Sequence, residues 1–281
     1  MNKINGDNFC KDAKYKLYRT VYEILHPSIS KRNISNYKVV LDEKLLPVQV
    51  FYPKRVTNMK KVILAIPGDG KVTECYGKYA TIYKNMAIET ETLIIAIDYF
   101  GKEIKYPTSS NKIFKVVKFL MEEFISNGIL KENIIFMSDS VGCNILKDLL
   151  FKLREKDFIV DNKIIWFYPV CQNSYENFLW DEKYLSMNFN LDKRINEYLD
   201  GYFSKGRSET GNSLVIDEDS KVKNIVFSGE LDVLKNEAEE FSRDWKAEFV
   251  KVRVLGHGFL GNINSEGMKE VYSRVNDFVK F

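Results

Sequence analysis

Hydrophobic residues in this chain gather in short unbroken runs that alternate with longer amphipathic stretches. Short apolar runs without alternation are typical of strands buried on both faces of a sheet. The runs are VILAI (62–66), LIIAI (93–97), NIIFM (133–137), KIIWF (163–167), NIVFS (224–228) and VKVRVL (250–255). Helical patterns lie around 74–88, 110–126, 141–155, 235–247 and 266–280. Strand and helix therefore alternate, which predicts an α/β fold with a mostly parallel central sheet flanked by helices.

Three segments depart from this alternation. YKVVL and VQVFY, within residues 37–52, predict an antiparallel hairpin at one edge of the sheet. Residues 1–36 hold a helical pattern with a basic face, which is either solvated or in contact with a membrane surface. Residues 171–220 show no clear strand, and their aromatic side chains either line a pocket or pack together. We expect 171–220 to be an inserted cap, to which 1–36 also belongs, on a main domain spanning 37–281.

Composition narrows the class of partner. The 281 residues carry a net charge of +3 from 42 basic and 39 acidic residues, without a long block of one sign. Such a balance gives no electrostatic footprint for nucleic acid, so a small-molecule partner is expected. Four cysteines form no CxxC pair and only two histidines are present, so we expect neither a metal nor a cofactor.

No stretch of about 18 apolar residues occurs, and the first residues lack the apolar core of a signal peptide. We therefore expect a cytoplasmic protein without stable membrane insertion. The sequence leaves a homodimer open.

A serine lies at an abrupt strand-to-helix turn in IIFMSDSVGCNIL (134–146). Ser140 follows a predicted strand, and ligands bind at the carboxyl ends of strands in open parallel sheets. Ser138 and Gly142 stand two positions to either side, in the pattern of a G-x-S-x-G nucleophile elbow whose first glycine is replaced. The alternative is a serine that caps the helix, with Asp139 complementing the helix dipole.

A serine hydroxyl becomes a good nucleophile only when a base takes its proton. Of the two histidines, His26 precedes a proline, whereas His257 follows the last predicted strand, between two glycines that suggest close backbone approach. Asp232 follows the strand NIVFS and is expected to orient the histidine, with Glu230 and Asp217 as competitors. The order serine, aspartate, histidine is the one expected for an α/β-hydrolase.

Four motifs in this order resemble those of the hormone-sensitive-lipase-like branch of the α/β-hydrolases. They are Pro67-Gly68-Asp69-Gly70 for His-Gly-Gly-Gly, Ser138-Asp139-Ser140-Val141-Gly142 for Gly-Asp-Ser-Ala-Gly, Asp232-Val233-Leu234 for Asp-x-Leu, and His257-Gly258-Phe259 for His-Gly-Phe. Asp98-Tyr99 also resembles the family's Asp-Tyr-Arg turn. The resemblance covers roughly residues 60–280 and implies an α/β-hydrolase fold of the esterase and lipase type.

The resemblance also implies a role for each matching residue. Ser140 would be the nucleophile, His257 the general base and Asp232 its orienting acid. The oxyanion hole would be built by Gly68, Asp69, Gly70 and Val141, with Gly68 shaping the loop. We further expect Asp139, Tyr168 and Phe259 to contact the substrate, and Cys143 to be a small core residue.

Two positions depart from the family pattern. Pro67 replaces the histidine, and Asp69 replaces a glycine beside the oxyanion. A carboxylate aimed at a developing negative charge would oppose catalysis. Asp69 therefore points away, binds a hydroxyl or amine of the substrate, or marks a weakened enzyme.

These features together predict a serine carboxylester hydrolase that acts on small, short-chain acyl esters through an acyl-enzyme. The same three residues also suit a peptidase, an amidase or an acyltransferase, because fold and triad do not select the leaving group. A catalytically weak hydrolase fold that binds a small ligand is the alternative from another class.

Overall fold

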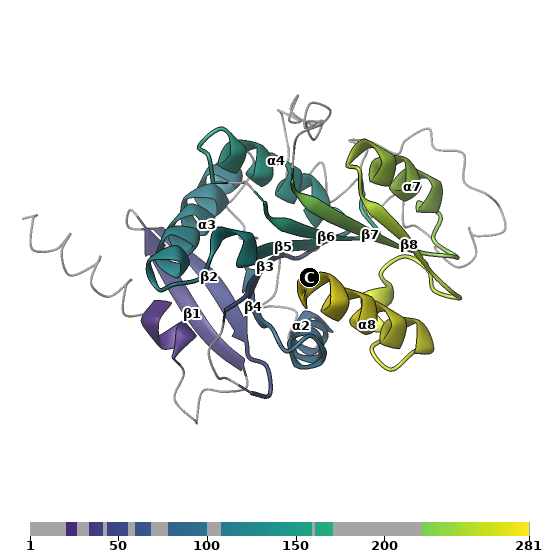
Figure 1. Ribbon diagram of the computed structural model, residues 1–281, viewed down its shortest axis with the longest axis horizontal. Helices are drawn as coiled ribbons and strands as arrows, with labels where there is room; N and C mark the ends of the chain where they lie inside the picture. Colours follow the sequence, from purple (N-terminus) through teal and green to yellow (C-terminus); the bar gives the residue numbers. More distant parts are fainter. Residues whose placement is uncertain are drawn as a thin grey trace, which may run out of the picture.

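A single mixed sheet forms the centre of the molecule. The computed structural model describes residues 21–26, 34–41, 44–55, 60–68, 78–99, 108–158, 161–170 and 221–280. Within them, eight strands lie in the order β1-β2-β4-β3-β5-β6-β7-β8 (Figure 1). Their bounds are β1 Ile34–Leu41, β2 Lys44–Phe51, β3 Val62–Ile66, β4 Leu93–Ile97, β5 Ile134–Asp139, β6 Lys163–Phe167, β7 Lys223–Gly229 and β8 Glu248–Val252.

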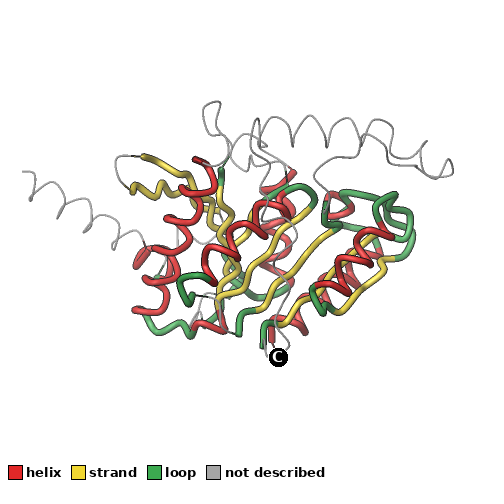
Figure 2. Tube along the Cα trace, turned by 90° about the horizontal axis from the view of Figure 1, so that it is seen from above, coloured by secondary structure: helices red, strands yellow, loops and turns green. Residues whose placement is uncertain are grey.

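The pairing of the strands places the antiparallel part at one edge. β1 pairs antiparallel with β2, and β2 pairs antiparallel with β4. From β4 to β8 every neighbouring pair is parallel. Figure 2 shows these strands side by side with helices lying along them. The carboxyl ends of β3, β5, β6, β7 and β8 therefore meet at the same edge of the sheet, where ligands bind in folds of this kind.

Helices cover both faces of the sheet. They are α2 Lys78–Glu89, α3 Thr108–Ser126, α4 Gly142–Arg154, α7 Lys235–Asp244 and α8 Glu266–Lys280, with short 3-10 turns η2 Lys131–Asn133 and η4 Phe259–Gly261. In Figure 1, α3, α4 and α7 lie on one face, and α2 and α8 on the other. This arrangement explains why the strands read as unbroken apolar runs: each of their faces packs against a helix layer.

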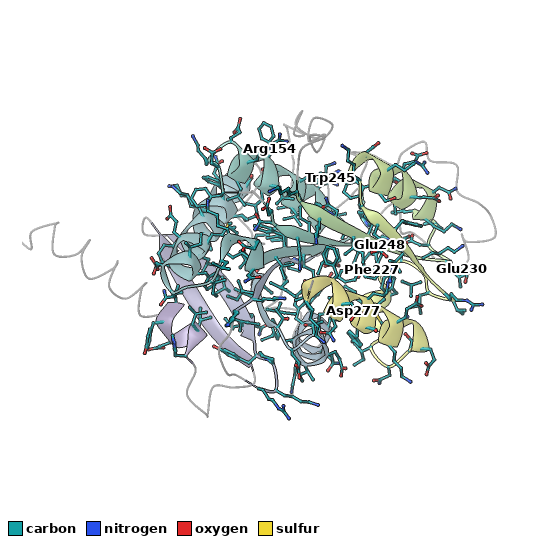
Figure 3. The ribbon with its side chains drawn as sticks, in the orientation of Figure 1. Arg154, Phe227, Glu230, Trp245, Glu248 and Asp277 are labelled. Atoms are coloured by element: carbon teal, nitrogen blue, oxygen red, sulfur yellow. The ribbon has the colours of Figure 1, made fainter. Side chains whose placement is uncertain are left out.

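Alternate side chains of β3 enter two separate cores. Val62, Leu64 and Ile66 of β3 belong to the core under α3 and α4. Ile63 and Ala65 point the other way, into the core under α2 and α8. All five are fully buried, and fully burying a valine, leucine or isoleucine contributes about 1.5–3 kcal/mol each. In Figure 3, side chains fill both layers, with Phe227 near the centre and Glu230 at the outer edge.

The predicted α/β fold with its flanking helices is confirmed, and so is the edge hairpin. The last strand is displaced: β8 ends at Val252, whereas the apolar run predicted a strand to residue 255. Val254 has a φ of +58°, which a β-strand does not accommodate.

The predicted cap falls largely outside the described residues, which exclude 171–220 and 1–20. β1 begins at Ile34, so the proposed boundary after residue 36 lies within a strand. Val21 and Ile24, in the described part of the first segment, are buried in the core under α3 and α4. Assignment of the remainder to a cap stays a prediction.

Candidate active site

Ser140 stands directly after β5 in a backbone conformation that few residues adopt. Its φ is +49°, in the left-handed region, which costs about 1–3 kcal/mol for a residue with a side chain. Both of its backbone groups are held. Its N–H donates to the carbonyl oxygen of Phe167 at 3.0 Å, and its carbonyl accepts from the N–H groups of Cys143 at 3.1 Å and Val170 at 3.2 Å. The neighbouring strand end therefore stabilises the turn.

Small residues are needed beside this turn because the loop after β3 passes close to it. A Cβ on Gly142 would lie 2.8 Å from the carbonyl oxygens of Ile66 and Pro67 and from Oγ of Ser138. The elbow pattern of the sequence therefore has a steric cause at Gly142. At the other position, Ser138 fits because its Oγ donates to the Ile66 carbonyl at 2.6 Å.

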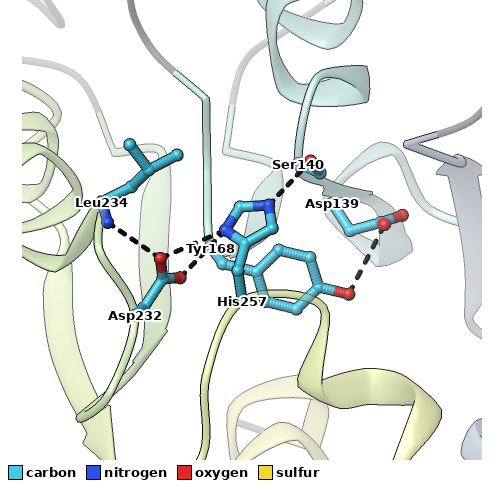
Figure 4. Close-up of polar contacts among 6 residues, drawn as sticks. All are labelled: Asp139, Ser140, Tyr168, Asp232, Leu234 and His257. Atoms are coloured by element: carbon cyan, nitrogen blue, oxygen red, sulfur yellow. Dashed lines mark hydrogen bonds and ion pairs between the residues drawn. The ribbon is translucent and has the colours of Figure 1, made fainter. Parts of the chain in front are cut away.

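The hydroxyl of Ser140 lies 3.0 Å from Nε2 of His257 (Figure 4). On the other side of the ring, Nδ1 lies 3.2 Å from Oδ1 and 3.1 Å from Oδ2 of Asp232. The carboxylate only accepts, so it selects the tautomer with the proton on Nδ1 and leaves Nε2 free to accept from the serine. Ser140 Oγ is thus engaged with the histidine, and Val141 occupies the N-cap position of α4 instead.

Contact between two loops brings Asp232 and His257 together. The turn after β7 donates from Leu231 N–H to the Leu255 carbonyl at 2.9 Å. A Cβ on Gly229 would come within 2.2 Å of that same carbonyl oxygen, so the loops touch through backbone. Oδ1 of Asp232 also accepts from the N–H of Leu234 at 2.9 Å, which fixes the carboxylate.

The alternative candidates were His26 for the base and Glu230 and Asp217 for the orienting acid. His26 is exposed, with Nδ1 3.1 Å from the Tyr22 carbonyl and its ring stacked on Tyr22. Glu230 accepts the N–H of Val254 at 3.0 Å through Oε2 and so holds the loop that leads to the histidine. Asp217 lies outside the described residues.

The backbone beside His257 comes close to the turn after β7 on one side, because a Cβ on Gly229 would lie 3.0 Å from the Gly256 carbonyl oxygen. A Cβ on Gly256 would meet only the Leu231 carbonyl oxygen, at an ordinary 3.7 Å, and a Cβ on Gly258 would meet nothing within 4 Å. Gly258 is instead required by conformation, because its φ is +75°.

The predicted oxyanion residues separate into three cases. The N–H of Gly68 donates to Oδ1 of Asp139 at 2.9 Å, so it is not available to an oxyanion. Gly68 was predicted to shape the loop rather than to donate, and that role stays a prediction. Val141 N–H donates to no other described residue. Asp69 and Gly70 lie outside the described residues.

This architecture is shared with a known protein family. The model of the alpha/beta hydrolase fold family matches residues 67–260. The chain belongs to the alpha/beta hydrolase fold family. This match confirms the family predicted from the four motifs.

Individual relatives of this alpha/beta hydrolase are distant in sequence. Vegetative-specific protein H5 of Dictyostelium discoideum is 24% identical over 266 residues, which cover 86% of this chain and 77% of that protein. An esterase of the archaeon Pyrobaculum calidifontis aligns with a TM-score of 0.71 and 16% identity, over 96% of this chain and 92% of its own. Carboxyl esterase 2 of Tuber melanosporum also aligns with a TM-score of 0.71, at 17% identity, covering 90% and 89%. These structures share the fold.

Asp139, Tyr168 and Phe259, expected to contact substrate, are buried inside this alpha/beta hydrolase, with exposed fractions of 2%, 3% and 1%. Asp139 accepts from Gly68 N–H and, through Oδ2, from the Tyr79 hydroxyl at 2.7 Å. Its carboxylate is therefore engaged within the protein. Burial, and next the charge of Asp139, raises the pKa of Tyr168 well above its usual range, so the phenol stays protonated.

The Cys143 thiol lies in the core of the molecule. Cys143 is fully buried, and that burial, followed by the nearby Asp139 charge, raises the pKa of its thiol well above the usual range. The thiol therefore stays protonated and packs as a core residue.

Among the described residues no cluster of three or more His, Cys, Asp or Glu suits a metal ion, and no described helix is long and apolar enough to cross a membrane.

Sequence patterns missed the residues that hold the loop after β3. Tyr99 donates its hydroxyl to the Pro67 carbonyl at 2.7 Å, and Tyr79 donates to Asp139 from helix α2. The Asp98-Tyr99 motif drew attention to Tyr99 without revealing its partner. Tyr79 lies in an amphipathic helix where an aromatic residue is typical of ordinary packing, so no sequence signal distinguished it.

Proposed function

We propose that the protein is a serine carboxylester hydrolase that cleaves small, short-chain acyl esters. The observation that carries the proposal is the unbroken series of contacts from the Ser140 hydroxyl, through both nitrogens of His257, to the Asp232 carboxylate. Each group has the geometry its role requires, because the nucleophile and base are 3.0 Å apart and the base is oriented by a buried acceptor.

The reaction follows from this arrangement. Ser140 Oγ bonds to the ester carbonyl carbon while its proton passes to Nε2 of His257, and the carbonyl electron pair moves onto oxygen. Collapse of this tetrahedral intermediate breaks the bond to the alcohol oxygen, which takes the proton from Nε2. Water then adds to the acyl-enzyme with the same base, and the carboxylic acid leaves as Ser140 regains its proton.

The negative oxygen of the tetrahedral intermediate needs backbone donors. We assign the Val141 N–H, at the amino end of α4, together with the N–H groups of Asp69 and Gly70. The position of Val141 after the nucleophile, and the positive end of the helix dipole behind it, favour this assignment. Gly68 N–H is excluded because Asp139 holds it.

The deciding experiment compares wild type with Ser140→Ala in hydrolysis of p-nitrophenyl acetate and in labelling by a fluorophosphonate probe. Wild type should turn over the ester and incorporate one label, and the variant should do neither while keeping its melting temperature. Ser242→Ala is the matched control, because Ser242 is a buried serine on α7 whose hydroxyl donates to the Glu239 carbonyl of its own helix.

Substrate class is tested with a panel of p-nitrophenyl esters from acetate to palmitate, alongside anilides and aminopeptidase substrates. We expect activity to fall beyond short acyl chains and the anilides to be poor substrates. Activity that rises steadily toward palmitate would contradict the short-chain assignment. A wild-type protein that neither hydrolyses nor becomes labelled would indicate a ligand-binding member of the fold.

A further inference from the structure

We propose that Tyr168 is a positioning residue that joins the nucleophile, the base and the loop after β3 into one rigid unit. The proposal rests on the proposed function, because it names how that site is held. Its three lines of support are the backbone of the segment after β6, the Tyr168 ring and the Tyr168 hydroxyl.

The segment Phe167–Val170 holds the backbone of Ser140 from both sides. Phe167 supplies the acceptor for the Ser140 N–H, and Val170 supplies a donor to the Ser140 carbonyl. The Val170 carbonyl in turn accepts from Nδ2 of Asn144 at 2.9 Å, which ties the segment to α4. The unusual conformation of Ser140 is therefore kept by the segment in which Tyr168 lies.

Tyr168 itself has a strained backbone conformation, and its side chain lies against His257. Its φ is +36°, and its N–H donates to the Phe227 carbonyl at 2.6 Å, which continues the pairing of β6 with β7 by one residue. A tyrosine rarely adopts this conformation, so it persists because its surroundings determine it. The consequence is that the side chain turns toward His257 at the end of the strand.

The ring of Tyr168 packs against the ring of His257, as Figure 4 shows. Their centroids are 4.9 Å apart, and the Tyr168 ring also meets that of Phe259 edge-on at 4.8 Å. The imidazole is therefore bounded by Asp232 on its Nδ1 edge and by an aromatic ring beside it. When His257 takes the proton from serine it becomes a cation within the distance at which an aromatic ring attracts a charge.

The hydroxyl of Tyr168 points at the carboxylate that anchors the loop after β3. It lies 3.5 Å from Oδ2 of Asp139, which makes shorter hydrogen bonds to the Tyr79 hydroxyl and, through Oδ1, to Gly68 N–H. The hydroxyl contact is thus the weakest of the three at this carboxylate. The ring, rather than the hydroxyl, should therefore carry most of the effect.

The experiment separates ring from hydroxyl with Tyr168→Phe and Tyr168→Leu. With p-nitrophenyl acetate, Tyr168→Leu should lower kcat by about tenfold to a hundredfold while KM changes by less than about threefold, because a misplaced base slows chemistry more than binding. Tyr168→Phe should keep kcat within about threefold of wild type. The fluorophosphonate labelling rate of Ser140 should fall in the leucine variant by the same factor as kcat.

Tyr272→Leu is the control for loss of a buried tyrosine, because Tyr272 is 9% exposed on α8 and its hydroxyl has no hydrogen-bond partner among the described residues. It should lower the melting temperature without changing kcat or the labelling rate. If Tyr168→Leu does not fold, Tyr168→Met, which retains an unbranched apolar side chain, takes its place.

A folded leucine or methionine variant that labels and turns over like wild type would overturn the positioning role. Equal losses in the phenylalanine and leucine variants would overturn the assignment to the ring. Neither result touches the proposed function, which fails if wild type neither turns over ester nor becomes labelled, or if Ser140→Ala turns over ester like wild type.

Discussion

Both carboxylate oxygens of Asp232 lie within hydrogen-bond distance of Nδ1 of His257, at 3.2 Å and 3.1 Å. One of them is also held by the N–H of Leu234. The carboxylate is therefore fixed before any proton moves, and its side chain is fully shielded from solvent. In the proposed mechanism, an acceptor in this place would stabilise the imidazolium that forms when Ser140 attacks.

Replacing Asp232 by asparagine tests this role. The amide keeps the shape but can turn its NH₂ toward Nδ1, which would put the imidazole proton on Nε2 and remove the acceptor that Ser140 needs. We expect kcat for p-nitrophenyl acetate to fall by roughly 10³–10⁴. The measurement is steady-state kinetics beside a thermal melt.

Glu230→Gln is the matched control, because Glu230 is the nearby competing carboxylate and binds the Val254 N–H rather than the histidine. Its kcat should stay within about threefold of wild type, since the glutamine oxygen can still accept that bond. A larger loss in Glu230→Gln than in Asp232→Asn would reverse the assignment.

Gly68→Ala should damage the loop after β3. An added Cβ would lie 2.6 Å from Oδ2 and 2.8 Å from the carbonyl oxygen of Asp139, and 3.1 Å from Cβ of Ser140. Neither the carboxylate nor the backbone can move without disturbing the nucleophile. We expect destabilisation of about 1–3 kcal/mol, measured by urea unfolding, together with a fall in kcat.

Gly256→Ala supplies the comparison, because a Cβ there meets one atom at a normal van der Waals distance and its φ is not in the left-handed region. Its free energy of unfolding should be within about 0.5 kcal/mol of that of wild type. Equal destabilisation by the two alanines would show that crowding at Gly68 is not the cause.

Most of the fold was predictable because its signals are local. β3, β4 and β6 are buried on both faces, and this burial is what an unbroken apolar run expresses. The end of β8 was not predictable from the apolar run alone. Val254 looks like a strand residue in sequence, yet it is 73% exposed, and its backbone turns where Glu230 binds its N–H. That contact comes from another loop and leaves no local signal.

The candidate site divides in the same way. Ser140, Asp232 and His257 could be placed at one sheet edge because each lies in the turn or loop that follows a strand. The surroundings of Asp139 could not be predicted from the sequence. A carboxylate beside a nucleophile is compatible with substrate contact, helix capping or a buried network. Tyr79 and Gly68, which decide between these, lie 60 and 71 residues away in sequence.

Ser138→Ala should cost stability at the elbow. The Ser138 hydroxyl is 1% exposed and donates to the Ile66 carbonyl at 2.6 Å, so its removal leaves a buried acceptor without this donor. We expect the free energy of unfolding to fall by about 1–2 kcal/mol. Ser126→Ala, at the more accessible end of α3, removes a similar bond to the Glu123 carbonyl and should cost less. Equal losses would mean that burial does not set the cost.

The folded protein should become more stable as pH rises, because one lysine of the sheet, Lys163, is buried. Lys163, the first residue of β6, is 9% exposed and donates to the Val279 carbonyl at the end of α8. Burial, and then the charges of Lys61 and Lys223, lowers the pKa of Lys163 from 10.5 to about 8. Between these values the unfolded chain binds more protons than the folded one, so this group favours folding increasingly as pH rises from about 8 to 10.5.

The test is urea unfolding of wild type and Lys163→Met at intervals from about pH 7 to 10.5, the window set by the two pKa values. The free energy of unfolding of wild type, relative to that of Lys163→Met, should increase across this pH window, because the variant has no charge to bury. Lys251→Met removes an exposed lysine of β8 and should preserve the wild-type pH dependence. A difference between wild type and Lys163→Met that is constant with pH, or that shrinks as pH rises, would mean that the ammonium group is not penalised by its burial.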